Sequence, residues 1–333
     1  MSHFDPKDPA DFKFQHILYE KQDRVARVTF NRPEVYNCCG AITARELTEA
    51  FVDASWDDSI AVVVLTGAGK DAFCTGGDVR EYADEYIKRP RNYWKWMGGF
   101  QAAMDAIRNV GKPTIARLNG MVVGGGNEFN LACDLAIAAD HVRIRQVGPQ
   151  VGSVAAGGAT QWLPIVVGER RAREILYLCE WIDAPTALQW GLVNQVVPYE
   201  QLDEAVGQMA AKLVDKFPEC LRYTKQQTNF WKDLAWNSTI GHARDWLALH
   251  FSSLEPYEGM QAFVEKRQPD RIGLRDKAAR GGSSEFLYGP YTHTCSACGA
   301  RGIPADFRYC GVCGAELAVK PAPLAVAGNG HKG

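Results

Sequence analysis

Residues 113–140 read PTIARLNGMVVGGGNEFNLACDLAIAAD, which places a glycine turn and an acidic helix between two apolar runs. The flanking segments, 113–120 and 134–140, are short and mostly apolar, as expected of strands that are covered on both faces. The helix between them carries Glu128 two residues after a run of three glycines. The stretch therefore predicts a strand–turn–helix–strand unit. It also suggests backbone that approaches a ligand and a carboxylate that acts on it.

The same alternation extends on both sides of this unit. Residues 16–31 alternate apolar and polar around a Gln-Asp turn, which predicts a β-hairpin. A helical pattern over 42–55 and an apolar run at 60–67 follow, and a further helical pattern covers 92–109. We therefore predict an α/β fold through about residue 200.

Composition divides the rest of the chain. Apolar residues recur at i, i+3 and i+4 from residue 201 to about 267, which predicts helices. The stretch RDKAARGGSSEF (275–286) has the charged, glycine- and serine-rich composition of a linker. The predicted organisation is a core over 1–200, a helical region over 201–270, a linker over 271–292, a cysteine module over 293–318 and a disordered tail over 319–333.

Bulk properties exclude several classes of protein. Of 333 residues, 46% are apolar and 23% are charged, and the net charge is −2, so no electrostatic argument favours a nucleic acid or an anionic membrane as partner. The polar, acidic start of the chain does not resemble a signal peptide. No stretch approaches the ~18 apolar residues of a membrane span. Six of the ten cysteines are scattered through apolar segments, as free thiols are. We expect a cytoplasmic protein.

The other four cysteines form two C-x2-C pairs, Cys295 with Cys298 and Cys310 with Cys313, separated by eleven residues. Four thiolates at this spacing suit tetrahedral zinc, and a site filled by four protein ligands is structural. Two disulfides or a rubredoxin-like iron site are the alternatives. Metal-coupled folding would replace the core that so short a module cannot build. Such a module could contact another subunit or a partner protein.

Two glycine-rich loops, FCTGGD (73–78) and VVGGGNEF (122–129), each lead into a helix. Neither matches a phosphate loop or the dinucleotide-binding fingerprint. Backbone N–H groups at such loops can form an oxyanion hole, where they stabilise negative charge on a carbonyl oxygen. Each loop taken alone could equally be a simple turn.

Together with further motifs, these loops show that the chain resembles the crotonase (enoyl-CoA hydratase) superfamily over roughly residues 14–270. The motifs are NRPEVYN (31–37), the two glycine loops, the segment from QVGPQVGS (146–153) to VGERRARE (167–174), GLVNQVVP (191–198) and EGMQAFVEKRQPD (258–270). The resemblance implies a spiral of ββα units followed by a C-terminal helical region for trimerisation. It also implies acyl-CoA substrates and a homotrimer or dimer of trimers.

The resemblance further assigns residues that would bind the substrate. Gly77 and Gly125 match the two amides of the oxyanion hole. Val35, and Thr75, Gly76, Asp78 and Val79 in the first glycine loop, match contacts to the pantetheine and adenine of coenzyme A. Asp78 could instead cap the helix that follows it. Lys266 lies in the segment that approaches the coenzyme A phosphates.

The catalytic carboxylates depart from the simple family pattern. Simple hydratases use two glutamates; the first matches Glu128, but the second falls at Gly148. The segment QVGPQVGS resembles dihydroxynaphthoyl-CoA synthase and 2-ketocyclohexanecarboxyl-CoA hydrolase; in the synthase, a glycine leaves space for a bicarbonate acting as base. The residue patterns at 74–97 and 119–128 resemble those of 6-oxocyclohex-1-ene-1-carbonyl-CoA hydrolase, a ring-opening enzyme.

We therefore expect an enzyme that adds water to an alicyclic oxo- or enoyl-CoA and then opens the ring. Glu128 would be the acid–base group, with a pKa raised by desolvation, and Gln146 and Ser153 would line the pocket or hold water. One alternative is a plain enoyl-CoA hydratase or isomerase that uses Glu128 alone. Another is a weakly catalytic coenzyme A-binding subunit that docks a partner through the cysteine module. Glu128 could also serve only as an acid at a helix N-terminus.

Overall fold

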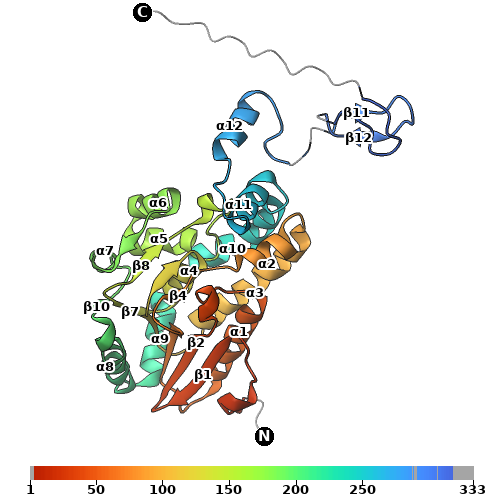
Figure 1. The fold of residues 1–333 in the computed structure, drawn as a ribbon. Coiled ribbons are helices and arrows are strands. Elements are labelled where there is room, and N and C mark those ends of the chain that lie inside the picture. Colours follow the sequence, from red (N-terminus) through yellow and green to blue (C-terminus); the bar gives the residue numbers. More distant parts are fainter. Residues whose placement is uncertain (1–3, 287, 289–290, 306, 318–333) are drawn as a thin grey trace, which may run out of the picture.

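Two β-sheets organise the computed structural model, which describes residues 4–286, 288, 291–305 and 307–317 (Figure 1). The tail predicted at 319–333 lies outside the described residues. The larger sheet has six strands, in the spatial order β1 (Ile17–Gln22), β2 (Val25–Phe30), β3 (Val62–Gly67), β5 (Thr114–Leu118), β7 (Leu135–Ala139) and β10 (Gln195–Val197). The smaller sheet has four strands, in the order β4 (Ala72–Cys74), β6 (Met121–Val123), β8 (Arg143–Arg145) and β9 (Ile182–Asp183).

The chain alternates between the sheets. Strands β3, β5 and β7 belong to the larger sheet, and each is followed by a strand of the smaller sheet, β4, β6 and β8. In the larger sheet only the β1–β2 hairpin is antiparallel, and β4, β6 and β8 run parallel to one another. The observed units are therefore strand, strand, helix.

Helices cover the larger sheet on both sides. In Figure 1, α1 packs on β1 and β2, whereas α8 lies on the other side and packs on β3, β5 and β7. The helices are α1 (Ala41–Trp56), α2 (Val79–Glu81), α3 (Pro90–Arg108), α4 (Gly125–Ala132), α5 (Ala159–Val167), α6 (Glu169–Leu178), α7 (Ala184–Trp190), α8 (Leu202–Val214), α9 (Pro218–Thr228), α10 (Phe230–His250), α11 (Leu254–Val264) and α12 (Arg271–Ala279). Short helical turns are η1 (Pro9–Asp11), η2 (Pro33–Val35), η3 (Tyr82–Tyr86), η4 (Gly148–Gln150) and η5 (Tyr199–Gln201).

The predicted hairpin, the apolar strand at 60–67 and the strand–turn–helix–strand unit of 113–140 are confirmed. All six residues of β3 are buried, as the apolar run predicts. The core continues to the site through an aromatic series: Phe30 contacts Phe73 and Phe129, and Phe129 contacts Phe100. Each of these fully buried side chains contributes about 2–3 kcal/mol of transfer free energy, which fixes α3 and α4 against the sheet.

The C-terminal helices hold one particular loop, the segment 148–154 that includes η4. Helix α11 approaches it so closely that a Cβ on Gly259 would overlap the backbone of Val151. Helix α12 starts where Asp270 caps it through the amide of Gly273, and the guanidinium of Arg271 donates to the carbonyl oxygen of Gln150 at 2.9 Å. The range 271–292, predicted as linker, therefore begins with a helix that contacts this loop.

Candidate active site

Three neighbouring strands of the smaller sheet end at one place. Because β4, β6 and β8 are parallel and adjacent, their carboxyl ends lie at the same edge, where ligands of parallel sheets usually bind. The loop 75–78 follows β4, the glycines 124–126 follow β6, and Gln146 to Gly148 follow β8. Sheet topology therefore brings together the three motifs that the sequence separates.

The two glycine loops touch each other. Gly76 has φ +87°, and a Cβ there would lie 2.8 Å from the amide nitrogen of Gly125, so only glycine permits this approach. Hydrogen bonds from Cys39 N to Gly76 O (2.7 Å) and from Asp78 N to Cys39 O (3.1 Å) fix the peptides on either side of Gly77. Gly125 is the first residue of α4, where an N–H group has no acceptor within the helix. In the described part of the chain, no protein acceptor takes the N–H of Gly77 or Gly125.

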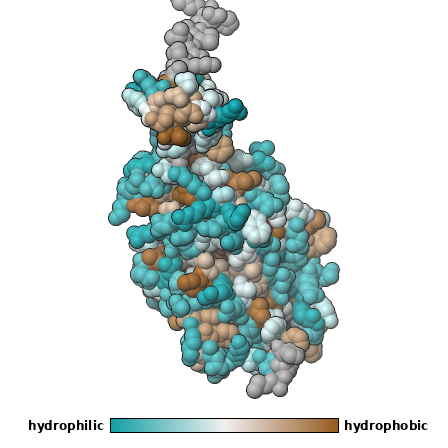
Figure 2. Space-filling view, turned by 90° about the vertical axis from the view of Figure 1, so that its right-hand side faces the viewer, coloured by the Kyte–Doolittle hydropathy of each residue, from teal (hydrophilic) through white to brown (hydrophobic). Residues whose placement is uncertain are grey.

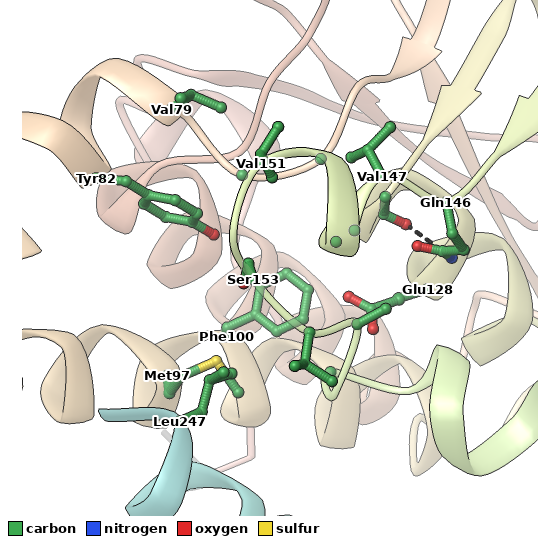
Figure 3. A pocket seen from close by; sticks show the side chains of 18 of the residues that line it. Val79, Tyr82, Met97, Phe100, Glu128, Gln146, Val147, Val151, Ser153 and Leu247 are labelled. Atoms are coloured by element: carbon green, nitrogen blue, oxygen red, sulfur yellow. Dashed lines mark hydrogen bonds between the residues drawn. The ribbon is translucent and has the colours of Figure 1, made fainter. Parts of the chain in front are cut away.

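A cavity of about 90 Å³ opens between these loops and helices α3, α10 and α11. Figure 3 shows Glu128, Gln146 and Val147 on one side of it and Tyr82 and Val79 on the other, with Phe100 and Ser153 between them. Its lining is Thr75, Gly76, Gly77, Val79, Tyr82, Tyr93, Trp96, Met97, Phe100, Gly124, Gly125, Glu128, Gln146, Val147, Gly148, Val151, Ser153, Val154, Ala155, Gly157, Leu247 and Met260. Glu128 is the one carboxylate in this lining.

Glu128 lies at the start of α4, and its side chain is 5% exposed. Its Oε1 accepts a hydrogen bond from the amide of Ala159 at 3.1 Å. Burial raises the pKa of the Glu128 carboxyl to about 7, although the backbone amides of Ala159 and Gly157 act in the opposite direction. A carboxyl group with a pKa near neutrality can accept and return a proton at physiological pH.

A side chain at position 148 would meet backbone atoms rather than open space. A Cβ built on it would lie 2.8 Å from the carbonyl oxygen of Ser153 and 3.3 Å from the amide of Ala155. No second acid therefore fits at this position without movement of the loop. The bicarbonate predicted near Gly148 stays a prediction.

Gln146 is fully buried, and only one of the two polar atoms of its side-chain amide has a hydrogen-bond partner among the described residues. Its Nε2 donates to the carbonyl oxygen of Gly124 at 3.3 Å, as the dashed line in Figure 3 marks. Its Oε1 has no partner among the described residues. A buried acceptor beside the cavity is suited to a ligand or water that donates a hydrogen bond.

The residues predicted to contact substrate divide into two groups. Thr75, Gly76 and Val79 line the cavity, as do Gln146, Gly148 and Ser153, whereas Val35, Asp78 and Lys266 do not. Asp78 caps α2, because its carboxylate accepts from the amides of Arg80 and Glu81, and it pairs with Arg32 at 3.1 Å. Val35 ends η2, beside Tyr36, whose carbonyl oxygen accepts from Thr75 Oγ1 at 3.1 Å.

Other lining residues carry no signal in the sequence motifs. Leu247 from α10 and Met260 from α11 reach the cavity only through helix packing. Of the aromatic group in α3, Trp96 and Phe100 are buried and line the cavity, whereas Trp94 is exposed and its indole N–H donates to Asp245. In the sequence, the i, i+4 spacing of Trp96 and Phe100 indicates that both side chains lie on the same face of the helix.

Two unpaired amides beside a buried carboxyl group define a site for carbonyl chemistry, in which charge on an oxygen is stabilised while a proton moves. Comparison with known proteins agrees with this class of site. Residues 20–272 match the family described as enoyl-CoA hydratase/isomerase. The chain therefore belongs to this family, within the crotonase superfamily of acyl-CoA-processing enzymes.

Solved structures show the same fold. An enoyl-CoA hydratase from Mycobacterium avium subsp. paratuberculosis is similar with 25% identity and a TM-score of 0.70, over 77% of this chain and 98% of that one. DspI from Pseudomonas aeruginosa is 32% identical with a TM-score of 0.62, over 81% and 98%. An enoyl-CoA hydratase from Bacillus anthracis is 30% identical with a TM-score of 0.62, over 77% and 98%. The predicted crotonase fold with a helical C-terminal region is confirmed.

The four clustered cysteines come together in the C-terminal module, drawn in blue in Figure 1. Their sulfur atoms lie within 4.8 Å of one another, with Cys295 and Cys313 at 3.6 Å and Cys298 and Cys310 at 3.8 Å. A tetrahedral metal with Zn–S bonds of about 2.3 Å places its sulfurs about 3.8 Å apart, so the donor set fits zinc. All four are free thiols.

The two halves of the module have the same backbone geometry. Gly299 and Gly314 both have φ +76°, and their amides donate to the carbonyl oxygens of Cys295 and Cys310, each at 2.9 Å. Strands β11 (His293–Thr294) and β12 (Arg301–Ile303) pair around the first half. The apolar core here consists of few side chains, so sulfur ligation is the main candidate for holding the module together.

Among the residues that the structure describes, no helix combines the length and apolarity needed to cross a bilayer.

Proposed function

We propose that this protein adds water to an alicyclic oxo- or enoyl-CoA thioester and then opens the ring hydrolytically. The observation that carries the proposal is the composition of the cavity, in which a single carboxyl group, Glu128, faces two amides that have no acceptor among the described residues. The cavity wall is otherwise largely apolar and aromatic, which suits a compact hydrocarbon ring.

In the hydration step, the amides of Gly77 and Gly125 would bind the thioester oxygen. Charge that develops on this oxygen as water attacks the β-carbon would be stabilised, and each such donor is worth about 3 kcal/mol of the barrier. Glu128 would take one proton from the attacking water and return it to the α-carbon of the enolate. The reaction then consumes one water and regenerates the carboxylate.

Gln146 supports the same step. A water molecule that donates one hydrogen bond to Glu128 can donate a second one, and the Oε1 of Gln146 is a buried acceptor that has no partner among the described residues. Two acceptors fix the orientation of water so that a lone pair points to substrate. The amide would thus orient the nucleophile although no second acid is present at Gly148.

Ring opening uses the same groups. Water adds to a ring ketone beside the α-carbon and loses its proton to Glu128. The bond between that carbon and the α-carbon then breaks, and its electron pair forms the thioester enolate that Gly77 and Gly125 stabilise. Protonation of the α-carbon by Glu128 yields an open-chain carboxylic acid, so one further water is consumed and no redox partner is required.

The test is the mass of the product from a panel of cyclic and linear enoyl-CoAs, with and without a ring ketone. Gain of two waters supports hydration with ring opening, and gain of one water on all substrates would reduce the function to that of a simple hydratase. Binding without any mass change would favour a coenzyme A-binding subunit instead. Glu128→Gln should retain coenzyme A ester binding and lose water addition.

We also propose that the four cysteines bind structural zinc, since all four tetrahedral positions would be filled and no position is left for a substrate. Metal analysis of purified protein should find one zinc per chain. A Cys298→Ser, Cys313→Ser double variant should lose it, whereas serine at Cys220, an exposed cysteine outside the cluster, should not.

Assembly as a homotrimer or a dimer of trimers is part of this proposal. Large apolar side chains are exposed on the C-terminal helices, among them Trp231 (65% exposed) and Phe263 (56% exposed), and Phe217 is 80% exposed. Light scattering of the intact protein tests the assembly. Figure 2 shows apolar residues on the surface of the C-terminal module as well, where Tyr309 and Val312 are exposed, which supports a protein contact for this module.

A further inference from the structure

Tyr82 enters the cavity from an unusual turn. It begins η3, a single π-helical turn that follows directly on α2. Such turns are rare and occur frequently at functional sites, because they rotate one side chain away from the direction that an α-helix would give it. Here the hydroxyl of Tyr82 points into the cavity (Figure 3).

The ring of Tyr82 is held by aromatic neighbours on several sides. Its centroid lies 4.8 Å from Trp96, 5.7 Å from Phe251, 5.8 Å from Tyr86 and 6.0 Å from Tyr93, with edge contacts to three of them. Rings packed in this way have a fixed orientation. The position of the hydroxyl is therefore set before any ligand binds.

This hydroxyl has no hydrogen-bond partner within the described residues, in contrast to that of Tyr86, which donates to Glu81. The indole N–H of Trp96, in the same aromatic wall, is also buried without a partner. This wall of the cavity thus offers donors for which the described part of the chain supplies no acceptor, and unmade hydrogen bonds of this kind favour an oxygen-bearing ligand.

The Tyr82 hydroxyl also lies next to Gly77 in the glycine loop 73–78. A Cβ at Gly77 would overlap the Tyr82 hydroxyl, so the two residues meet at the Cα of Gly77. A β-oxo thioester carries its two carbonyl oxygens on the two carbons that flank the α-carbon, and in the planar syn conformation both oxygens point the same way. When the amide of Gly77 binds the thioester oxygen, the second oxygen is directed to a donor beside Gly77.

We propose that the Tyr82 hydroxyl donates a hydrogen bond to a second oxygen of the acyl group, on the carbon β to the thioester carbonyl. This inference deepens the proposed function and rests on it. Tyr82 would polarise the ring ketone and stabilise the alkoxide formed when water adds to it. The hydroxyl keeps its proton throughout, because burial and the nearby Glu128 and Tyr93 hold the pKa of Tyr82 well above its usual range.

The kinetic test compares Tyr82→Phe with wild type on two cyclohexene-carbonyl-CoA esters, one with and one without a ketone beside the α-carbon. Loss of one such donor costs on the order of 10²-fold in kcat, so kcat/KM for the keto ester should fall by about that factor. For the ester without the ketone it should change by less than about threefold, since no contact is lost there. An equal loss on both esters, or no loss on the keto ester, would overturn the assignment.

Tyr86→Phe is the matched control. It removes a hydroxyl from the same aromatic group, but Tyr86 bonds to Glu81 and does not line the cavity. We expect this variant to keep the wild-type ratio of kcat/KM values for the two esters. Thermal melting of both variants separates a packing defect from the loss of a donor.

A binding experiment separates this inference from the proposed reaction. In a Glu128→Gln background, calorimetric titration measures the affinity for the two esters without turnover. The keto ester should bind about tenfold more tightly, and addition of Tyr82→Phe should abolish the difference. If Glu128→Gln does not discriminate, or if the double variant still does, Tyr82 is not the donor, whatever reaction the wild type catalyses.

Discussion

The carboxyl group of Glu128 accepts a hydrogen bond from the backbone amide of Ala159, 3.1 Å away, at the first residue of α5. This hydrogen bond joins the carboxyl group in α4 to the N-terminus of α5, and it favours the charged form of the carboxyl group. Burial opposes it and prevails, since the pKa of Glu128 rises from 4.5 to about 7. The predicted reaction depends on this balance.

The first prediction concerns the pH dependence of water addition. Glu128 acts as a base only when it is ionised, so kcat/KM should rise with pH through about 7 and then level off. Initial rates between pH 5 and 9 measure the inflection in the free enzyme. An inflection near the ordinary pKa of an exposed glutamate would show that Glu128 is not the base.

The second prediction concerns stability. A carboxyl group with a raised pKa in the folded state favours folding most below its unfolded pKa and loses this contribution as the pH rises through about 7. The rise of the Glu128 pKa from 4.5 to about 7 corresponds to ~3 kcal/mol.

Glu128→Gln isolates this contribution. The free energy of unfolding of wild type relative to this variant should fall by up to ~3 kcal/mol between pH 4.5 and 8. Urea unfolding at several pH values provides the measurement, and a constant difference between the two proteins would contradict the prediction.

The third prediction concerns the missing acid. A side chain at Gly148 meets the carbonyl oxygen of Ser153, so Gly148→Glu should distort the loop and cost ~1–3 kcal/mol of stability. Activity on linear enoyl-CoAs should fall rather than rise, and Gly148→Ala should show a smaller effect of the same sign. A gain of hydratase activity in Gly148→Glu would mean that the loop yields and a second acid can be installed.

The fourth prediction concerns the contact between the two glycine loops. Gly76→Ala introduces a Cβ against the amide of Gly125 at a positive φ, so kcat should fall by on the order of 10²-fold. Gly99→Ala is the control, because it lies inside α3 and its added Cβ meets no atom within 4 Å. The control should be active and more stable by ~0.5–1 kcal/mol.

The fifth prediction concerns metal removal. Treatment of the intact protein with a strong chelator should unfold the cysteine module, because metal ligation supplies most of its folding energy. Hydrogen exchange at residues 293–305 and 307–317 should then accelerate, whereas exchange in β3 and β5 should not change. Unchanged exchange in the module after complete metal loss would show that the thiols alone hold it.

The larger sheet was predictable because its strands, apart from the short edge strand β10, are five or six residues long and are either mostly apolar or, in the β1–β2 hairpin, alternate apolar and polar residues. The smaller sheet was not predicted, because its strands have only two or three residues, too few to show a periodic pattern. That sheet is nevertheless what brings Gly77, Gly125 and Gln146 together. The motifs therefore indicated several residues that line the candidate site, whereas their proximity depends on pairings between distant short segments.

The aromatic side of the site was harder to anticipate. The turn η3 directs Tyr82 into the cavity, and no sequence rule distinguishes a π-helical turn from an α-helical one. Leu247 and Met260 arrive from α10 and α11, more than a hundred residues from Glu128 in sequence. Such contacts are set by how helices pack, which a single sequence does not specify.

The hydrogen bond from Arg271 to Gln150 determines where the chain can be truncated without disturbing the candidate active site. Residue 271 lies at the very end of the match to the family, yet its side chain fastens the loop that carries Gly148 and Ser153. Truncation at residue 270 would remove the Arg271–Gln150 hydrogen bond together with the cysteine module. A loss of turnover could then be attributed to the module although the lost hydrogen bond caused it. A cut after residue 286 keeps α12 and isolates what the module itself contributes.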